Sequence, residues 1–161
     1  MVVICDSSAL IPLSLINQLH RLEEMFGGVL IPQGVYDEVV EKGEGRAGAE
    51  EVRNAPFIQT KELQNPQDAE PYIDPLSQPD AEVIALAKQE EADLIITRDR
   101  RLRRRARQEG LGAITLWNFL VEVKEAGIIP EVKPLLDELR NKGVLIREGV
   151  YQETLRQAGE L

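Results

Sequence analysis

Short apolar runs that alternate with helical segments are the feature that most constrains the fold of this chain. Runs at residues 2–5, 28–31 and 93–97 have the length and apolar character of buried strands, and helical apolar spacing follows each of them. Strands that alternate with helices form a mostly parallel sheet, and the helices then cover both of its faces. The sequence therefore predicts an α/β fold with right-handed crossovers.

The remaining elements follow from apolar periodicity and from glycine and proline positions. Residues 62–79 contain four prolines and are predicted to be a long irregular connection. With 161 residues, 43% of them hydrophobic, the chain suits a single domain, 1–161, with C-terminal helices of about 117–161 packed on it. We expect further strands at 56–60 and 113–116, and helices at about 8–25, 34–42, 46–53, 80–91, 99–109, 117–126, 130–142 and 149–159.

Composition excludes several classes of protein. A lone Cys5 cannot form an internal disulfide and is expected to be a small core residue in a reducing compartment. His20 is the only histidine, which argues against imidazole catalysis and histidine-rich zinc sites. No basic region precedes the first apolar run, and no stretch approaches the roughly 20 apolar residues of a membrane span. We therefore expect a cytoplasmic protein with no membrane segment.

Four acidic residues are expected at one edge of the sheet. Asp6 and Asp99 directly follow strand-like runs, and Glu38 lies about one turn into the helix after the second run. Asp80 opens a helix that runs antiparallel to the next strand, which places it level with that strand's carboxyl end. Open α/β sheets bind their ligands at this edge. A carboxylate cluster without histidine or cysteine favours Mg²⁺ or Mn²⁺ over zinc.

Each acid also has a purely structural interpretation. Asp6 and Asp99 are each as well suited to cap the helix that follows as to bind a metal ion. Asp80, three residues after Ser77, fits the acidic position of a capping box, and Glu38 fits an exposed helix face.

The hydroxyls of Ser8 and Thr97 stand beside these acids. They are suited either to orient a carboxylate or a bound water, or to cap a helix. Glu82 is a further nearby acid, which we expect at the surface in preference to a second ligand position.

An arginine-rich segment follows the last acid. Residues 98–107 contain seven arginines, although the chain has a net charge of −9 and a pI near 4.8. Such a chain repels polyanions unless its basic residues are concentrated locally. The segment is either a solvated helix face or a phosphate-binding surface, with Leu102 and Ala106 facing the core. The residues expected to bind nucleic acid are Arg98, Arg100, Arg101, Arg104 and Arg105.

Several blocks, taken in order, resemble those of PIN-domain proteins. They are V-V-I-C-D-S-S-A-L, I-P-Q-G-V-Y-D-E-V-V, P-D-A-E-V-I-A-L-A and I-I-T-R-D-R-R-L-R-R-R-A. The tail A-I-T-L-W-N-F-L-V-E-V-K-E-A-G-I-I-P is similar to a prokaryotic PIN subfamily that resembles VapC-type toxins. The resemblance implies an α/β/α sandwich that hydrolyses RNA phosphodiesters with Mg²⁺ or Mn²⁺. It also implies that Asp6, Glu38, Asp80 and Asp99 are the catalytic and metal-binding acids.

Two positions depart from the pattern of this family. The residue before the last aspartate is often acidic in the family but is Arg98 here, and Pro79-Asp80 stands where a Gly-Glu pair is frequent.

The expected function is a metal-dependent endoribonuclease acting on single-stranded RNA, as the toxin of a toxin–antitoxin pair. The alternatives are a catalytically weak PIN module that binds nucleic acid or protein, and a magnesium-dependent phosphohydrolase. The resemblance implies a small antitoxin partner. The apolar residues Leu10, Ile11, Leu13 and Leu15 are expected either to pack in the core or to supply a partner groove or homodimer seam.

Overall fold

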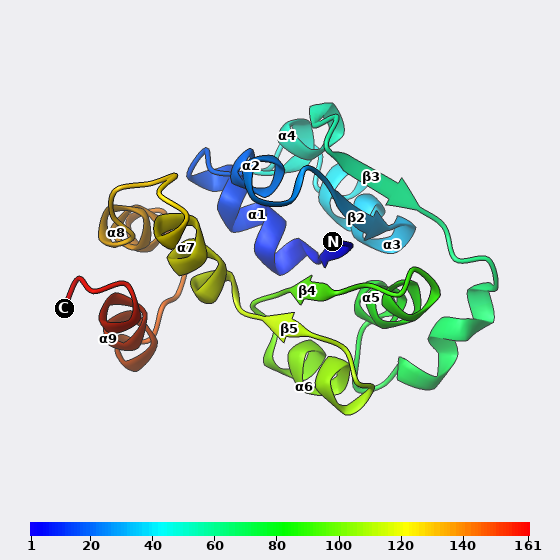
Figure 1. Ribbon diagram of the computed structural model, residues 1–161. Coiled ribbons are helices and arrows are strands. Elements are labelled where there is room, and N and C mark those ends of the chain that lie inside the picture. The colour runs from blue at the N-terminus through cyan, green and yellow to red at the C-terminus, as the bar shows by residue number, and fades with distance from the viewer.

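A five-stranded, entirely parallel sheet forms the centre of the molecule (Figure 1). The computed structural model describes all residues, 1–161. The strand order is β3-β2-β1-β4-β5, which confirms the predicted α/β class and parallel pairing. The strands are β1 (Val3–Cys5), β2 (Val29–Pro32), β3 (Ile58–Lys61), β4 (Leu94–Ile96) and β5 (Ala113–Ile114).

The register of the central strands fixes the edge where the candidate acids were predicted. β1 lies between β2 and β4, and Cys5 pairs directly with Ile96 at the carboxyl ends of β1 and β4. The next residues, Asp6 and Thr97, therefore leave the sheet side by side.

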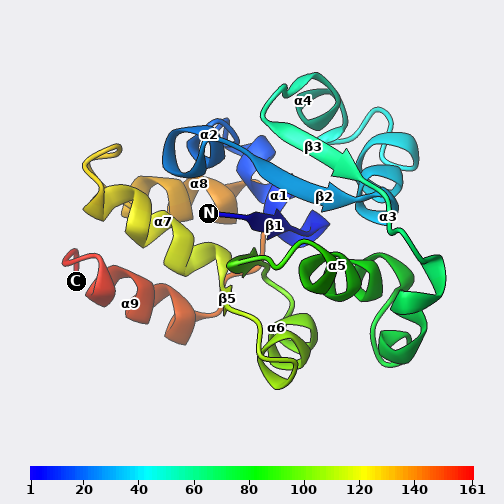
Figure 2. The same cartoon turned by 45° about the vertical axis from the view of Figure 1, so that its right-hand side comes forward.

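The helices enclose this sheet and extend beyond it. Figures 1 and 2 both show α7, α8 and α9 grouped to one side of the strands, with the C-terminus at the end of α9. None of the helices is long and apolar enough to cross a membrane. They are α1 (Ser7–Leu15), α2 (Arg21–Phe26), α3 (Gln33–Tyr36), η1 (Asp37–Glu41), α4 (Ala49–Asn54), η2 (Pro66–Tyr72), α5 (Gln78–Gln89), α6 (Arg100–Gln108), α7 (Leu116–Glu125), α8 (Lys133–Asn141) and α9 (Glu148–Gln157).

The single helix predicted over residues 8–25 is two helices, so that prediction was wrong. α1 ends at Leu15, and Asn17 adopts a left-handed conformation with φ of 57°. Asparagine tolerates this conformation just after a helix end, and the chain then turns away from the helix axis. His20 consequently precedes α2 and does not lie in the middle of a helix.

The helix predicted over residues 34–42 also differs from a regular helix. The short α3 continues into η1, a π-helical turn that carries Glu38. Gly43 follows, and a side chain there would clash with the Val39 carbonyl, so the chain needs a glycine to leave this turn. Residues 43–48 form a loop, and the helix predicted from about residue 46 begins at Ala49.

One contiguous cluster of 40 buried residues forms the core. Cys5 lies inside it, and so do Leu102 and Ala106, which confirms the inward face predicted for the arginine-rich helix. Leu10 and Leu13 of α1 are also fully buried, so these two positions belong to the core and not to an exposed partner groove.

Candidate active site

Asp6 is the most enclosed of the four candidate acids. It is the residue after β1 and the N-cap of α1, where its Oδ1 accepts a hydrogen bond from the Ala9 amide at 3.2 Å. Only 1% of its surface is exposed. The Ser8 hydroxyl lies 2.8 and 2.9 Å from its two oxygens, and the Thr97 hydroxyl donates to Oδ2 at 2.7 Å. Asp6 is thus both a helix cap and a carboxylate oriented by two hydroxyls.

The same hydroxyls connect the end of β4 to the start of α1. Thr97 Oγ1 accepts from the Asp99 amide at 2.9 Å, and Ser8 Oγ accepts from the Arg98 amide at 2.8 Å. The Arg98 guanidinium donates through Nε to the Ser8 carbonyl at 3.0 Å. This network fixes the two turns that carry Asp6 and Asp99 relative to one another.

The other three acids come from separate elements. Asp99 is the N-cap of α6 and accepts from the amides of Arg101 and Leu102 at 2.8 and 3.1 Å. Asp80 lies in the first turn of α5, where its amide donates to Ser77 Oγ at 3.3 Å. Glu38 is exposed on η1. The capping interactions expected of Asp6 and Asp99 are therefore present.

Asp80 is electrostatically coupled to each of the other three acids. Burial raises the pKa of Asp6 to about 7, the Thr97 and Ser8 hydrogen bonds oppose that rise, and the charge of Asp80 adds to it. Burial is also the main reason that the pKa of Asp80 rises to about 6, followed by the charges of Asp99 and Glu38. Asp80 thus feels all three other acids, as expected for like charges gathered at one site.

The donor set suits a hard divalent cation, but the ligands are not assembled. No group of three or more His, Cys, Asp or Glu side chains is positioned to hold a metal ion. Mutual repulsion keeps carboxylates apart in the absence of a counter-charge. The chemistry of the site nevertheless fits Mg²⁺ or Mn²⁺, because the acids coupled to Asp80 all offer carboxylate oxygens, which these ions prefer as ligands.

Glu82 plays a structural part that the sequence did not indicate. Its Oε1 accepts from the Gly34 amide at 2.9 Å, and its Oε2 accepts from Gln78 at 3.0 Å. A Cβ at Gly34 would come within 2.9 Å of this carboxylate. Glu82 therefore caps α3 from α5 and joins the element before Glu38 to the helix that carries Asp80.

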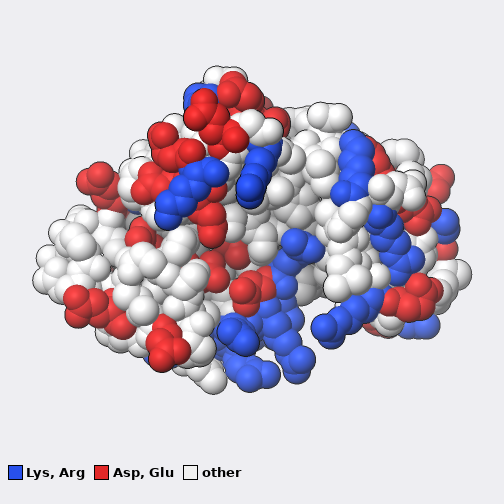
Figure 3. Space-filling model, turned by 180° about the vertical axis from the view of Figure 1, so that it is seen from behind, with Lys and Arg blue, Asp and Glu red and all other residues white.

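The five arginines predicted to bind nucleic acid occupy different environments. Arg98 is half-buried against Ser8, and burial lowers the pKa of its guanidinium. Arg105 pairs with Glu109 at 3.2 Å and lies 4.8 Å from the centre of the Tyr72 ring, so internal contacts engage it. Arg100, Arg101 and Arg104 are exposed and have no carboxylate partner. Figure 3 shows Lys and Arg side chains gathered in the lower middle of this face, below acidic side chains near its centre.

A hollow with a volume of about 760 Å³ opens beside Asp99. We call it the arginine groove; it lies between the N-termini of α6 and α7 and the start of α9, and its lining includes Ser8, Asp99, Arg103, Trp117 and Arg147. Sequence reasoning selected none of the last three. The sequence contained a local indication for Arg103, because it lies four residues after Asp99 and therefore on the same helical face. It contained none for Trp117 and Arg147, because only tertiary packing brings them together.

Comparison with known families agrees with the fold and with the resemblance in the sequence. A family model described as DUF3368: PIN domain matches residues 2–160. Among solved structures, a PilT N-terminus domain protein, SSO1118, from the hyperthermophilic archaeon Sulfolobus solfataricus P2 superimposes with a TM-score of 0.56 and 18% identity, covering 76% of this chain and 92% of that one. That likeness shows a shared fold. No curated protein matches the sequence. The chain belongs to the PIN-domain family, whose members are generally nucleases that use divalent metals.

Proposed function

We propose that this protein is a Mg²⁺- or Mn²⁺-dependent endoribonuclease that hydrolyses phosphodiester bonds of single-stranded RNA. The observation that carries the proposal is the position of three carboxylates close enough to Asp80 to be coupled to it, at the carboxyl edge of a parallel sheet. Like charges near a buried carboxylate such as Asp6 are costly unless a cation offsets them, so such a cluster is suited to ion binding.

Asp6, Glu38, Asp80 and Asp99 are the residues that would hold the cation. When bound, a divalent ion supplies a more acidic water and offsets negative charge on the phosphate oxygens. The protein contributes orientation, since Ser8 and Thr97 fix the rotamer of Asp6 and the α6 amides fix that of Asp99. The exposed arginines of α6 favour approach of the substrate, whose phosphates the acids repel.

A polymeric substrate fits this surface better than a small phosphomonoester. One of the acids, Asp99, lines the arginine groove, which at about 760 Å³ exceeds the space that a single phosphate group needs. The open face carries several arginines beyond those next to the acids. A phosphohydrolase for small substrates has no evident use for this additional basic surface.

A PIN module that binds RNA without cutting it is the second candidate. Two observations favour it: no three carboxylates form a ready metal site, and the position before Asp99 is Arg98, where the family pattern often has an acid. Cleavage assays separate the two candidates directly.

The decisive test is cleavage of a mixed RNA pool by purified protein with Mn²⁺, Mg²⁺ or EDTA. Asp99→Asn and Asp6→Asn are suitable variants, because asparagine caps a helix as well as aspartate does but carries no charge. We expect each to lose at least about a hundredfold in rate, the magnitude typical of lost transition-state stabilisation at charged sites. Asp68→Asn, on the exposed η2, is the matched control. Wild-type rates in both site variants would refute the assignment.

The toxin role rests on the VapC-like resemblance and has a separate test. We propose that expression in a bacterial host arrests growth, that the Asp99→Asn variant does not, and that a small partner protein relieves the arrest. Normal growth of cells containing active, metal-dependent ribonuclease would remove the toxin role and leave the nuclease proposal intact.

A further inference from the structure

The arginine groove is positively charged although the protein is acidic. The chain carries a net charge of −9, and most of its ion pairs join neighbouring surface residues. The groove contains two acids, and one of them, Glu153, already pairs with Arg156. No carboxylate pairs with any of the four arginines that line it, which are Arg98, Arg100, Arg103 and Arg147. Unpaired guanidinium groups in an acidic protein indicate a polyanionic ligand.

Trp117 provides a flat apolar surface in the lining of the groove. It is the only tryptophan of the chain and is partly exposed. It lies in the first turn of α7, where Thr115 Oγ1 accepts from the Asn118 amide at 3.0 Å and the Asn118 side chain bonds back to Thr115. This cap fixes the backbone on both sides of Trp117. A held indole beside arginines is the arrangement on which unpaired nucleobases stack.

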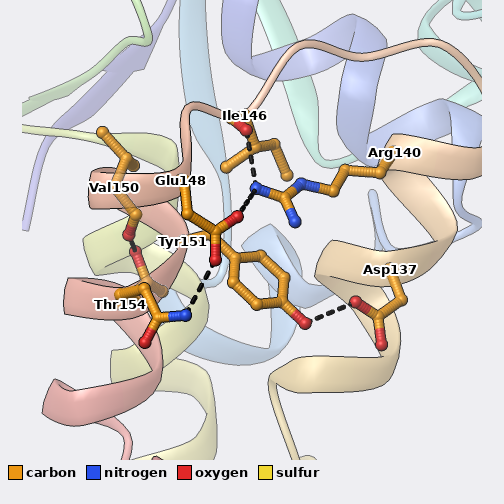
Figure 4. Close-up of polar contacts among 8 residues, drawn as sticks. Asp137, Arg140, Ile146, Glu148, Val150, Tyr151 and Thr154 are labelled. Carbon is orange, nitrogen blue, oxygen red and sulfur yellow. Dashed lines mark hydrogen bonds and ion pairs between the residues drawn. The ribbon is translucent and has the colours of Figure 1, made fainter.

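A polar cluster on α8 and α9 holds the backbone that carries Arg147 (Figure 4). Arg140 donates to the Ile146 carbonyl at 2.8 Å and to Glu148 at 3.1 Å, the residues on either side of Arg147. The Arg140 guanidinium also lies 3.9 Å from the centre of the Tyr151 ring, whose hydroxyl donates to an Asp137 oxygen at 2.6 Å. Arg147 therefore extends from a fixed turn, although its own side chain is exposed.

We propose that the arginine groove is the path by which single-stranded RNA leaves the acidic site. Arg103 and Arg147 bind successive phosphates there, and Trp117 stacks on one base. Ser8 and Asp99 line the groove and also belong to the acidic site, so a strand on the acids continues into it. A single strand is required because the bases of a duplex are already stacked and present no free face to Trp117. This inference rests on the proposed function and assigns its substrate contacts to α6, α7 and the turn before α9.

The test is to bind an unlabelled 12-nucleotide RNA to the protein in EDTA and to measure binding by the change in Trp117 fluorescence. We expect quenching by the single strand and none by the matching duplex. Arg103→Gln and Arg147→Gln should each weaken binding and flatten the log–log salt dependence by about 0.7. Trp117→Leu should weaken binding roughly five- to a hundredfold. Because this variant has no tryptophan, its binding is measured by the fluorescence anisotropy of a labelled strand.

The matched control is Arg53→Gln on α4, which removes an equal charge from outside the groove and should leave affinity and salt slope unchanged. Thermal melts establish that each variant is folded. Wild-type affinity and slope in both groove arginine variants, or RNA binding that leaves Trp117 fluorescence unchanged, would overturn the path. Equally tight binding of polyglutamate with the same sensitivity to these variants would assign the groove to an acidic protein segment and overturn the RNA assignment.

Cleavage measured in parallel keeps this inference separate from the proposed function. RNA cutting that the groove variants leave unchanged, together with unchanged binding, overturns the groove path while the nuclease proposal stands. Quenching and salt-dependent binding without any metal-dependent cutting support the groove as a single-strand site and refute the nuclease proposal.

Discussion

Asp6 shows how a single residue can serve structure and chemistry together. Its two oxygens receive bonds from an amide and two hydroxyls, and yet burial keeps its pKa near 7. Hydrogen bonds to the charged form lower a carboxyl pKa, so desolvation outweighs them here. A cation that binds at this edge would replace the proton that the buried carboxyl otherwise retains near neutral pH.

This balance predicts a pH dependence of stability in the metal-free protein. The pKa of Asp6 is raised from 3.8 to about 7, so the folded state binds its proton more tightly than the unfolded state does. The stabilisation is fully present below pH 3.8 and is lost as the pH rises through about 7. As the pH rises from 5 to 8, we expect the ionisation of Asp6 to reduce the free energy of unfolding by about 2–3 kcal/mol. Urea denaturation in EDTA measures this change.

Asp6→Asn is the matched variant for this prediction. Its amide keeps the α1 cap but does not titrate in this range, so its stability should fall less than that of the wild type. An equally steep fall in the variant would assign the pH dependence to Asp80, whose pKa is also raised, or to groups outside the site.

Sequence spacing was sufficient to place Asp6 and Asp99, because both directly follow strands and parallel strands end at one edge of the sheet. It was insufficient for the side chains of the arginine run. The choice between solvent and an internal partner depends on neighbours from other elements, and Tyr72, on the irregular connection, is the partner that engages Arg105.

At the scale of elements, α6 combines a buried face with a charged one. Leu102 and Ala106 are fully buried, whereas Arg101 and Arg104 are exposed. The helix is held by these apolar contacts and by its Asp99 cap, which leaves its exposed arginines free for a ligand. The amphipathic pattern of α6 could be predicted from the sequence, because the residues at apolar spacing are the ones that are buried.

Leu102→Ala should therefore destabilise the protein by about 2–5 kcal/mol, the usual cost of deleting a buried leucine side chain. Arg101→Ala, one residue earlier on the exposed face, should change stability by less than about 0.5 kcal/mol. Both values come from denaturant titrations under the same conditions. A cost below 1 kcal/mol for Leu102→Ala would contradict the packing described here for α6.

The form of other elements could not be predicted, either because the residue pattern hides a local signal or because the form depends on distant contacts. The break after α1 has a local cause in Asn17, but apolar residues continue on both sides and conceal it. The backbone hydrogen bonds of the π-helical turn η1 span one residue more than those of an α-helix. The pattern of apolar and polar residues does not indicate this difference. Glu82, on α5, caps α3, the helix that precedes η1, and the two contacting residues are 48 positions apart in the sequence.

At the scale of the whole molecule, the candidate site joins parts of the chain that are far apart in sequence. Its acids come from the end of β1, from η1, from α5 and from the start of α6. The α/β class and this shared edge could be predicted, because topology rules act on the order of elements. The arginine groove could not, because it depends on how α7 and α9 pack beside α6.

A cation held by these acids would connect elements that otherwise separate on unfolding, so it should stabilise the whole fold. We expect millimolar Mn²⁺ to raise the melting temperature by several degrees, as binding to the native state alone requires. Because the cation competes with protons for Asp6 and Asp80, the increase should be larger at pH 8 than at pH 6. Asp80→Asn should largely abolish it, since Asp80 is coupled to the other three acids, whereas Asp68→Asn should not. A stabilisation by Mn²⁺ that persists unchanged in Asp80→Asn would place the bound ion elsewhere on this acidic protein.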